Sequence, residues 1–266
     1  MTKPQDVITD LVAAAEEVDQ FVAGLDEQGW NTPTPATGWT VKHQVGHLAF
    51  IFRIAGLAAA DPAAFTAMTA KIGPGGFDAA VNGALADYIH DPAEVLLTRW
   101  RAERDAGVKA LAALPAGHVV PWLVNPLPVE VLACAGMMEL FGHGQDIADA
   151  LGIRREYTDR IKHVTGFSVR TWDFGYQSRG LTPPDVRFGF DLVAPSGVDW
   201  VFGPPDAEQR ISGSAADFCL LVTRRRHRDD LDLRATGPDA EQWLDIAQAY
   251  RGPAGEGRRP GQFRSS

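Results

Sequence analysis

The stretch Met137-Met138-Glu139-Leu140-Phe141-Gly142-His143-Gly144-Gln145-Asp146 contains the most informative pair of residues in this chain. It is an apolar run with helical spacing, and Glu139 and His143 lie four residues apart within it. Side chains at positions i and i+4 share one face of a helix, so both could reach the same metal ion. A carboxylate that merely supports a histidine on a helix face has the same spacing, so both interpretations stay open.

A second histidine-bearing segment lies upstream, at Gly38-Trp39-Thr40-Val41-Lys42-His43-Gln44-Val45-Gly46-His47-Leu48. Thr40 is suited to the N-cap of a helix, and His43 and His47 fall on adjoining turns. The helical period is set by four apolar residues, Val41, Val45, Leu48 and Ile51.

His47, Glu139 and His143 together predict a metal site with three protein ligands and an open position, as in catalytic zinc sites. Other divalent ions accept the same ligands. His43 could be a ligand, orient a ligand or lie at the pocket rim. The segment is not the zinc-protease helix, because Gln44 occupies the position where that motif has its glutamate.

Composition indicates an ordinary globular protein of 266 residues, 45% hydrophobic and 22% charged. A formal net charge of −9 argues against a nucleic-acid partner, which would need a basic face. No apolar run is long enough to cross a bilayer and no secretory leader is evident, so we expect a cytoplasmic protein with no membrane partner. Cys134 and Cys219 are predicted to be reduced core residues.

Periodicity predicts a bundle of four long helices in the first part of the chain. Asp91 and Pro92 are expected to cap and begin the third of them. The expected long helices cover residues 6–28, 40–59, 91–114 and 128–152, with an irregular insertion at 72–77 and a minor helix at 79–88.

The pattern changes to extended stretches after about residue 183. Residues 186–193 and 198–202 flank a turn sequence and predict a hairpin, and Ser214 is expected to cap a helix. The predicted fold class is α+β, a four-helix bundle followed by a small α+β module whose later elements are a strand at 231–235 and a helix at 238–249. The predicted domains are residues 1–175, residues 176–252 and a flexible tail at 253–266.

Two groups of motifs resemble a known family. Gly38-Trp39-Thr40-Val41 with His47, and Glu139 with His143-Gly-Gln-Asp, resemble the DinB-like metal-binding bundles. The stretch from Ile211 to His227 is similar to the sterol-carrier-like domain that follows such bundles in mycothiol-dependent maleylpyruvate isomerases and related mycothiol S-transferases.

The resemblance implies zinc bound by His47, Glu139 and His143, with mycothiol as the thiol that the metal activates. It also implies that Asp146 and Gln145 bind the thiol and that Asp146 serves catalysis. His43 is a further catalytic candidate from its position one turn before His47. Asp146 could instead pair with a nearby arginine, Arg154 or Arg155. One of Arg224, Arg225 and Arg226 could bind an acidic substrate. The alternative is that all three are solvent-exposed at the end of a helix, and the sequence alone does not distinguish the two.

These implications favour an enzyme, a zinc-dependent mycothiol-type S-transferase that attacks an electrophilic small molecule. A cis-trans isomerase of the maleylpyruvate type is the nearest alternative. A non-catalytic metal- and ligand-binding protein is a third hypothesis, because a fold does not determine a function. The partners are expected to be a low-molecular-weight thiol and an electrophile, with a homodimer as one possible assembly.

Overall fold

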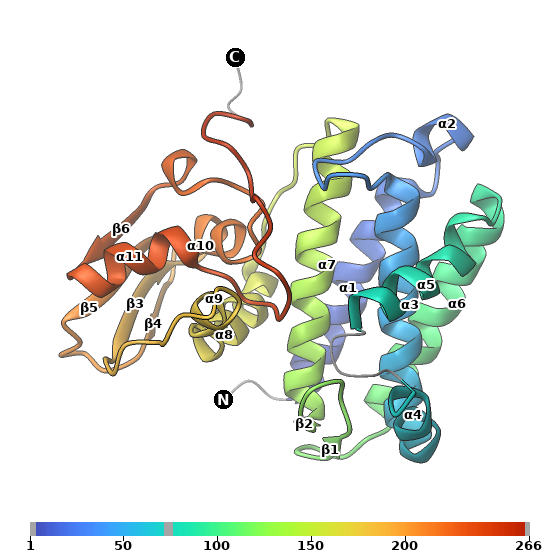
Figure 1. Cartoon of the computed structure of the whole chain (residues 1–266), viewed down its shortest axis with the longest axis horizontal. Helices are drawn as coiled ribbons and strands as arrows, with labels where there is room; N and C mark the ends of the chain where they lie inside the picture. The colour runs from blue at the N-terminus through green and yellow to red at the C-terminus, as the bar shows by residue number, and fades with distance from the viewer. Residues whose placement is uncertain (1–3, 72–76, 264–266) are drawn as a thin grey trace. The chain divides into compact units, whose positions relative to one another are not determined.

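Four long helices pack side by side in the first part of the chain (Figure 1). The computed structural model describes residues 4–71 and 77–263. Its long helices are α1 (Pro4–Val22), α3 (Val41–Ala60), α6 (Ala93–Ala112) and α7 (Val129–Leu151). Helix α3 packs against both α6 and α7, and α1 also packs against both of those helices. The predicted four-helix arrangement is therefore confirmed.

Shorter elements connect the long helices. These are α2 (Glu27–Trp30), α4 (Pro62–Thr69), α5 (Phe77–Ile89) and an antiparallel pair, β1 (Val119–Val120) with β2 (Leu127–Pro128). Helix α5 corresponds to the predicted minor helix, whereas α4 was not predicted. Most of the expected irregular insertion at 72–77 lies outside the described residues.

Two helix ends differ from the sequence predictions. The first helix ends at Val22 rather than near residue 28, because Asp26 starts α2 by accepting a hydrogen bond from the Gly29 backbone at 2.8 Å. Asp91 was expected to cap the third helix, which is wrong, since its carboxylate pairs with Arg99 at 2.6 Å. A Glu27 carboxylate oxygen instead accepts from the first backbone N–H of that helix, at 3.2 Å.

The contact between α3 and α6 depends on two glycines. A Cβ on Gly107 would lie 2.6 Å from the Phe52 carbonyl oxygen, and one on Gly56 would lie 3.0 Å from the Gly107 Cα. The backbones can approach this closely only because both side chains are absent. This close contact at Gly56 and Gly107, called here the glycine seam, holds α3 against α6. Helix α3 also packs against α7.

The residue contacts divide the chain into two compact units, Met1–Arg155 and Glu156–Ser266. The second unit contains a four-stranded sheet with the order β4-β3-β5-β6. Strands β3 and β5 are parallel, and the two outer pairs are antiparallel, so the predicted hairpin is confirmed and the α+β class with it. The strands are β3 (Phe188–Val193), β4 (Asp199–Phe202), β5 (Gln209–Ser214) and β6 (Leu233–Thr236).

Aromatic side chains form the core of the second unit. Phe190 of β3 lies 5.6 Å from Phe218 and 5.8 Å from Trp243, measured between ring centroids. Ser214 caps α10 as predicted, accepting from two backbone N–H groups. The helices of this unit are α8 (Lys162–Arg170), α9 (Phe174–Gln177), α10 (Ala215–Val222) and α11 (Pro238–Ile246), with 3₁₀ turns at η1 (Asp159–Ile161) and η2 (Arg228–Asp230).

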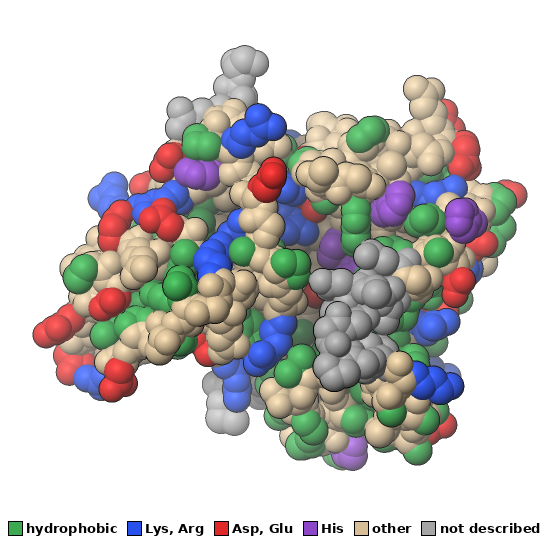
Figure 2. All heavy atoms as spheres, viewed as in Figure 1, with side chains coloured by type: hydrophobic (Ala, Val, Ile, Leu, Met, Phe, Trp, Pro, Cys, Tyr) green, Lys and Arg blue, Asp and Glu red, His purple; other side chains and the backbone are tan. Residues whose placement is uncertain are grey.

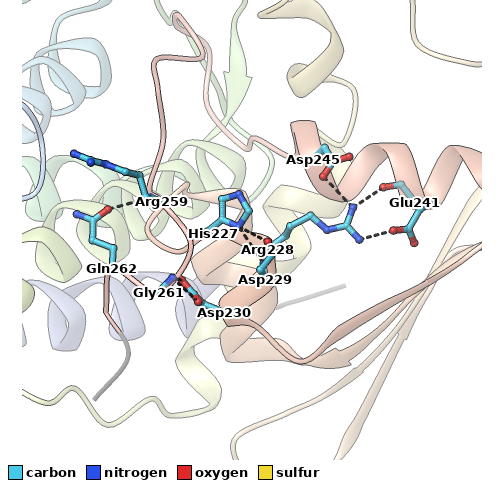
Figure 3. A network of polar contacts seen from close by, with 9 residues as sticks. All are labelled: His227, Arg228, Asp229, Asp230, Glu241, Asp245, Arg259, Gly261 and Gln262. Atoms are coloured by element: carbon cyan, nitrogen blue, oxygen red, sulfur yellow. Dashed lines mark hydrogen bonds and ion pairs between the residues drawn. The ribbon is translucent and has the colours of Figure 1, made fainter. Parts of the chain in front are cut away.

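Polar contacts around η2 connect three segments of the second unit (Figure 3). Arg228 pairs with Glu241 and, at 2.9 Å, with Asp245, both on α11. The Gly261 backbone N–H donates to the Asp230 carboxylate at 2.8 Å. The described part of the tail therefore bonds to this unit, and the domain limits and tail flexibility inferred from sequence remain predictions.

Surface and hydropathy features agree with a globular chain. Acidic and basic side chains are interspersed on the face drawn in Figure 2. Within residues 4–71 and 77–263, no helix is both long enough and apolar enough to cross a membrane. Cys219 is buried as predicted, whereas Cys134 is partly exposed.

Candidate metal centre

Three side chains from α3 and α7 meet at one carboxylate oxygen. The Nε2 atom of His47 lies 3.3 Å from Glu139 Oε2, and the Nε2 atom of His143 lies 3.2 Å from the same oxygen. One potential ligand atom from each residue lies within 4.8 Å of the others. Two helices therefore bring together the three residues that the sequence analysis proposed as ligands.

The environment of this cluster favours an ionised carboxylate. The side chains of His47, Glu139 and His143 are 12%, 23% and 14% exposed. Burial alone would raise the pKa of Glu139, but hydrogen bonds and charge interactions with His143 and His47 outweigh it and hold that pKa well below its usual value. An ionised Glu139 beside two imidazoles is a donor set that suits zinc and other divalent ions.

Trp39 packs against the imidazoles. Its ring is stacked on that of His143, with centroids 5.8 Å apart and an interplanar angle of 21°, and it lies 5.6 Å from the His47 ring. The Trp39 carbonyl accepts hydrogen bonds from the Thr34 backbone N–H at 2.8 Å and from the Thr34 hydroxyl at 3.0 Å. The loop that precedes α3 thus holds an aromatic ring against two of the candidate ligands.

Gln44 is a functional candidate that the sequence analysis missed. Its Oε1 lies 2.5 Å from Nδ1 of His143, on the side of the ring away from the carboxylate. Its Nε2 donates to Thr34 Oγ1 at 2.9 Å and lies 3.4 Å from Asp146 Oδ2. The available signal was its position three residues before His47, which places both on one helix face.

His43 lies at the start of α3 and is not a member of the ligand cluster. Its Nδ1 accepts from the Thr40 backbone N–H at 3.2 Å and lies 2.9 Å from the Thr40 hydroxyl. Burial, with a contribution from the charge of Lys42, lowers the pKa of His43. The contacts are those of a helix-capping residue, and its catalytic role remains a prediction.

Asp146 and Gln145 are both buried. Asp146 has no exposed surface and lies against Gln44, whereas Gln145 donates to Asp149 at 2.8 Å. Asp146 therefore contacts the ligand cluster through Gln44, and Gln145 bonds to the next turn of its own helix. The contacts with a thiol that the resemblance implies for them remain predictions.

Other candidates lie elsewhere. Trp122 stacks on Phe65 with ring centroids 5.8 Å apart. Arg225 bonds to the Thr223 carbonyl at 2.5 Å, and the Arg226 guanidinium lies 4.0 Å from the centre of the Phe263 ring. These arginines belong to the second unit, and a role for them or for Arg224 in substrate binding remains a prediction.

Comparison with known proteins identifies the family. Residues 11–148, which include His47, Glu139 and His143, match the model of the mycothiol maleylpyruvate isomerase N-terminal domain. The chain belongs to the mycothiol maleylpyruvate isomerase family. The family predicted from sequence motifs is therefore confirmed, while the DinB-like and sterol-carrier-like assignments remain predictions.

Relatives of this family member include two uncharacterized proteins of Mycobacterium tuberculosis, from strains CDC 1551 / Oshkosh and H37Rv. Each is 44% identical over 262 residues, which cover 97% of this chain and 100% of the relative.

Solved structures show the same fold at low sequence identity. A crystal structure of a mycothiol-dependent maleylpyruvate isomerase has a TM-score of 0.54 at 15% identity, covering 83% of this chain and 88% of that one. A point mutant of such an isomerase has a TM-score of 0.56 at 14% identity, with the same coverage.

Proposed function

We propose that this protein is a metal-dependent, mycothiol-using enzyme that catalyses isomerisation of the maleylpyruvate type. The observation that carries the proposal is the convergence of His47, Glu139 and His143 on one point within the part of the chain that matches the family model. Two imidazoles and a carboxylate are a donor set found in catalytic zinc sites, which keep a position for a further ligand.

The chain's own residues would hold the ion and shape its surroundings. His47 and His143 would each supply Nε2, and Glu139 would supply a carboxylate oxygen and one negative charge. A zinc ion bound there would favour the thiolate form of a coordinated thiol. Trp39, packed on both rings, would limit the directions from which a thiol could approach.

The comparisons support isomerisation rather than the S-transfer favoured by the sequence analysis. Both solved structures with this fold are described as maleylpyruvate isomerases. Either reaction begins when the thiolate sulfur bonds to an electrophilic carbon. For a conjugated alkene such as maleylpyruvate, the π electron pair moves onto the conjugated carbonyl oxygen, which leaves a single bond about which the adduct can rotate. In isomerisation the carbon–sulfur bond breaks again after rotation and the thiol returns unchanged, whereas transfer retains that bond and consumes the thiol.

Metal content and thiol balance test this proposal. Purified protein supplied with zinc should retain about one ion per chain and convert maleylpyruvate to fumarylpyruvate only when mycothiol is present, with no net loss of thiol. Glu139→Gln should lose both the metal and the activity. Glu130→Gln is a matched control, because Glu130 lies on the same helix but accepts from the Gly117 backbone N–H instead.

Each contrary outcome points to another hypothesis. Stoichiometric loss of mycothiol with an electrophile, without isomerisation, would favour the S-transferase. Retained metal and bound thiol without turnover of either kind would favour a binding protein. A folded wild-type protein that takes up no metal would overturn the proposal.

A further inference from the structure

A chain of hydrogen bonds runs from the loop before α3 to the back of one candidate ligand. It links the Trp39 carbonyl, the Thr34 hydroxyl, the Gln44 amide and the His143 imidazole. We infer that Gln44 is a positioning residue that fixes the tautomer of His143, so that Nε2 of this ring is the atom offered to a metal ion. The metal-binding part of this inference rests on the proposed function.

The direction of the first two hydrogen bonds is set by chemistry. The Trp39 carbonyl can only accept, so the Thr34 hydroxyl donates its single proton to it at 3.0 Å. The Thr34 oxygen is then an acceptor for Gln44 at 2.9 Å, and the acceptor must face the NH₂ end of the amide. The Asp146 carboxylate oxygen, 3.4 Å from the same nitrogen, requires the same orientation.

The orientation of Gln44 determines where His143 carries its proton. With the amide nitrogen facing Thr34, the amide oxygen faces His143 and lies 2.5 Å from Nδ1. An amide oxygen only accepts, so Nδ1 must carry a hydrogen. In the neutral ring the lone pair is then on Nε2, 3.2 Å from Glu139 Oε2. An ionised Glu139 facing this lone pair requires a positive charge between the two atoms, and either a second ring proton or a bound metal ion supplies it.

The second candidate histidine, His47, has no comparable acceptor in the described part of the chain to fix its tautomer. Its Nδ1 is buried and has no hydrogen-bond partner in residues 4–71 and 77–263. Metal-binding histidines usually donate their second N–H to a carboxylate, carbonyl or water, and loss of such a partner commonly weakens metal affinity about 10- to 100-fold. Gln44 supplies that partner to His143.

The tautomer can be read directly in the metal-free protein. In ¹⁵N-labelled metal-free wild type, titrated until the His143 nitrogen resonances themselves show a neutral ring, the remaining proton should be on Nδ1. Gln44→Met removes the acceptor at similar volume, and His143 should then carry its proton at Nε2 and donate it to Glu139. Gln44→Glu keeps an oxygen beside Nδ1, and its other oxygen would share a proton with the Asp146 carboxylate that it faces, so the wild-type tautomer should be retained.

Metal affinity provides the second measurement. Competition with a chelator should show zinc binding to Gln44→Met about 10- to 100-fold weaker than to wild type, with recovery in Gln44→Glu. Gln248→Leu is the matched control, since Gln248 is a buried glutamine of the second unit that donates to the Tyr250 and Gly252 carbonyls. That variant should bind zinc as wild type does.

The possible failures are separable. A neutral wild-type His143 ring with its proton at Nε2, or an unchanged tautomer in Gln44→Met, would overturn the role of Gln44 whatever the metal result. Zinc affinity unaffected in Gln44→Met would overturn it as well. Absence of zinc binding in the wild type, together with the expected tautomer change, would reject the proposed function and leave the control of the tautomer by Gln44 standing.

Discussion

Helix α7 of the first unit and helix α10 of the second both have buried faces, but the side chains that they bury differ. Helix α7 buries the polar side chains of Gln145 and Asp146 beside its apolar ones, whereas the residues that α10 buries, among them Phe218, Cys219 and Leu221, include no charged or amide side chain. Buried polar groups are costly unless each has a hydrogen-bond partner, while apolar side chains require only close packing. The interior of the first unit therefore contains a polar hydrogen-bond network next to His143. The core of the second unit is built around packed aromatic rings.

This difference suggests how the two units should respond to perturbation. Changes near the polar network should alter metal binding more than folding, and changes in the aromatic core should alter folding more than metal binding. The glycine seam between α3 and α6 is an apolar contact within the first unit, which allows packing effects and site effects to be separated there.

Cysteine reactivity tests whether the second core is closed. Burial raises the pKa of Cys219 to about 12, although a contact with the Thr165 hydroxyl opposes this. At about pH 8 its thiolate should be roughly a thousandfold scarcer than that of an ordinary cysteine, so iodoacetamide should modify it only after unfolding. Mass spectrometry of labelled peptides, with and without urea, checks this. Cys134 of the first unit, which is partly exposed, is the internal reference. Equal labelling rates for Cys219 in folded and denatured protein would show that the second core is open.

Truncation in the aromatic core should have the largest effect on stability. Phe218 is fully buried between the Phe190 and Trp243 rings, so Phe218→Ala should lower the free energy of unfolding by about 3–5 kcal/mol. Zinc content per folded chain should not change. Urea denaturation followed by tryptophan fluorescence gives the stability, and Val201→Thr on exposed β4 should change it by less than about 0.5 kcal/mol. Similar losses in the two variants would contradict an aromatic core that dominates stability.

Adding one carbon to the glycine seam should have a smaller effect. The new Cβ in Gly107→Ala would meet the Phe52 carbonyl, and the forced separation of α3 and α6 should cost about 1–3 kcal/mol. Gly83→Ala on α5 is the control, because no described atom outside its chain neighbours and its own helix backbone lies within 4 Å of its Cβ position. Removal of a helical glycine there should stabilise the protein by about 0.5–1 kcal/mol. The urea midpoints should therefore move in opposite directions, and a shift in the same direction would argue against the seam.

Local periodicity was sufficient to predict the bundle and the candidate ligands. Glu139 and His143 are one helical turn apart, and the apolar spacing around His47 places it on an inward face. Gln44 was missed because its role depends on contacts with Thr34 and His143, which lie in other elements of the fold. No local pattern encodes such contacts.

Strand β5 of the sheet could not be predicted from its own sequence either. Strand β5 pairs in parallel with β3, and its sequence Gln-Arg-Ile-Ser-Gly-Ser has little of the apolar alternation that predicts a strand. Its conformation follows from the neighbour it pairs with. Asp91 was assigned as a cap from its position before a proline, but Arg99, two turns later, competes successfully for the carboxylate.

The smallest expected effect concerns His43. From the sequence, His43 could be a metal ligand, could orient a ligand or could lie at the rim of the pocket. If His43 caps α3 through the Thr40 N–H, His43→Ala should lower the free energy of unfolding by about 1 kcal/mol without loss of zinc. His43→Gln should restore stability, because glutamine at the third helical position can accept from the same backbone N–H. Denaturation and elemental analysis of the two variants separate the roles. Loss of zinc from a folded His43→Ala protein would make His43 part of the metal site and would extend the polar network of the first unit to the start of α3.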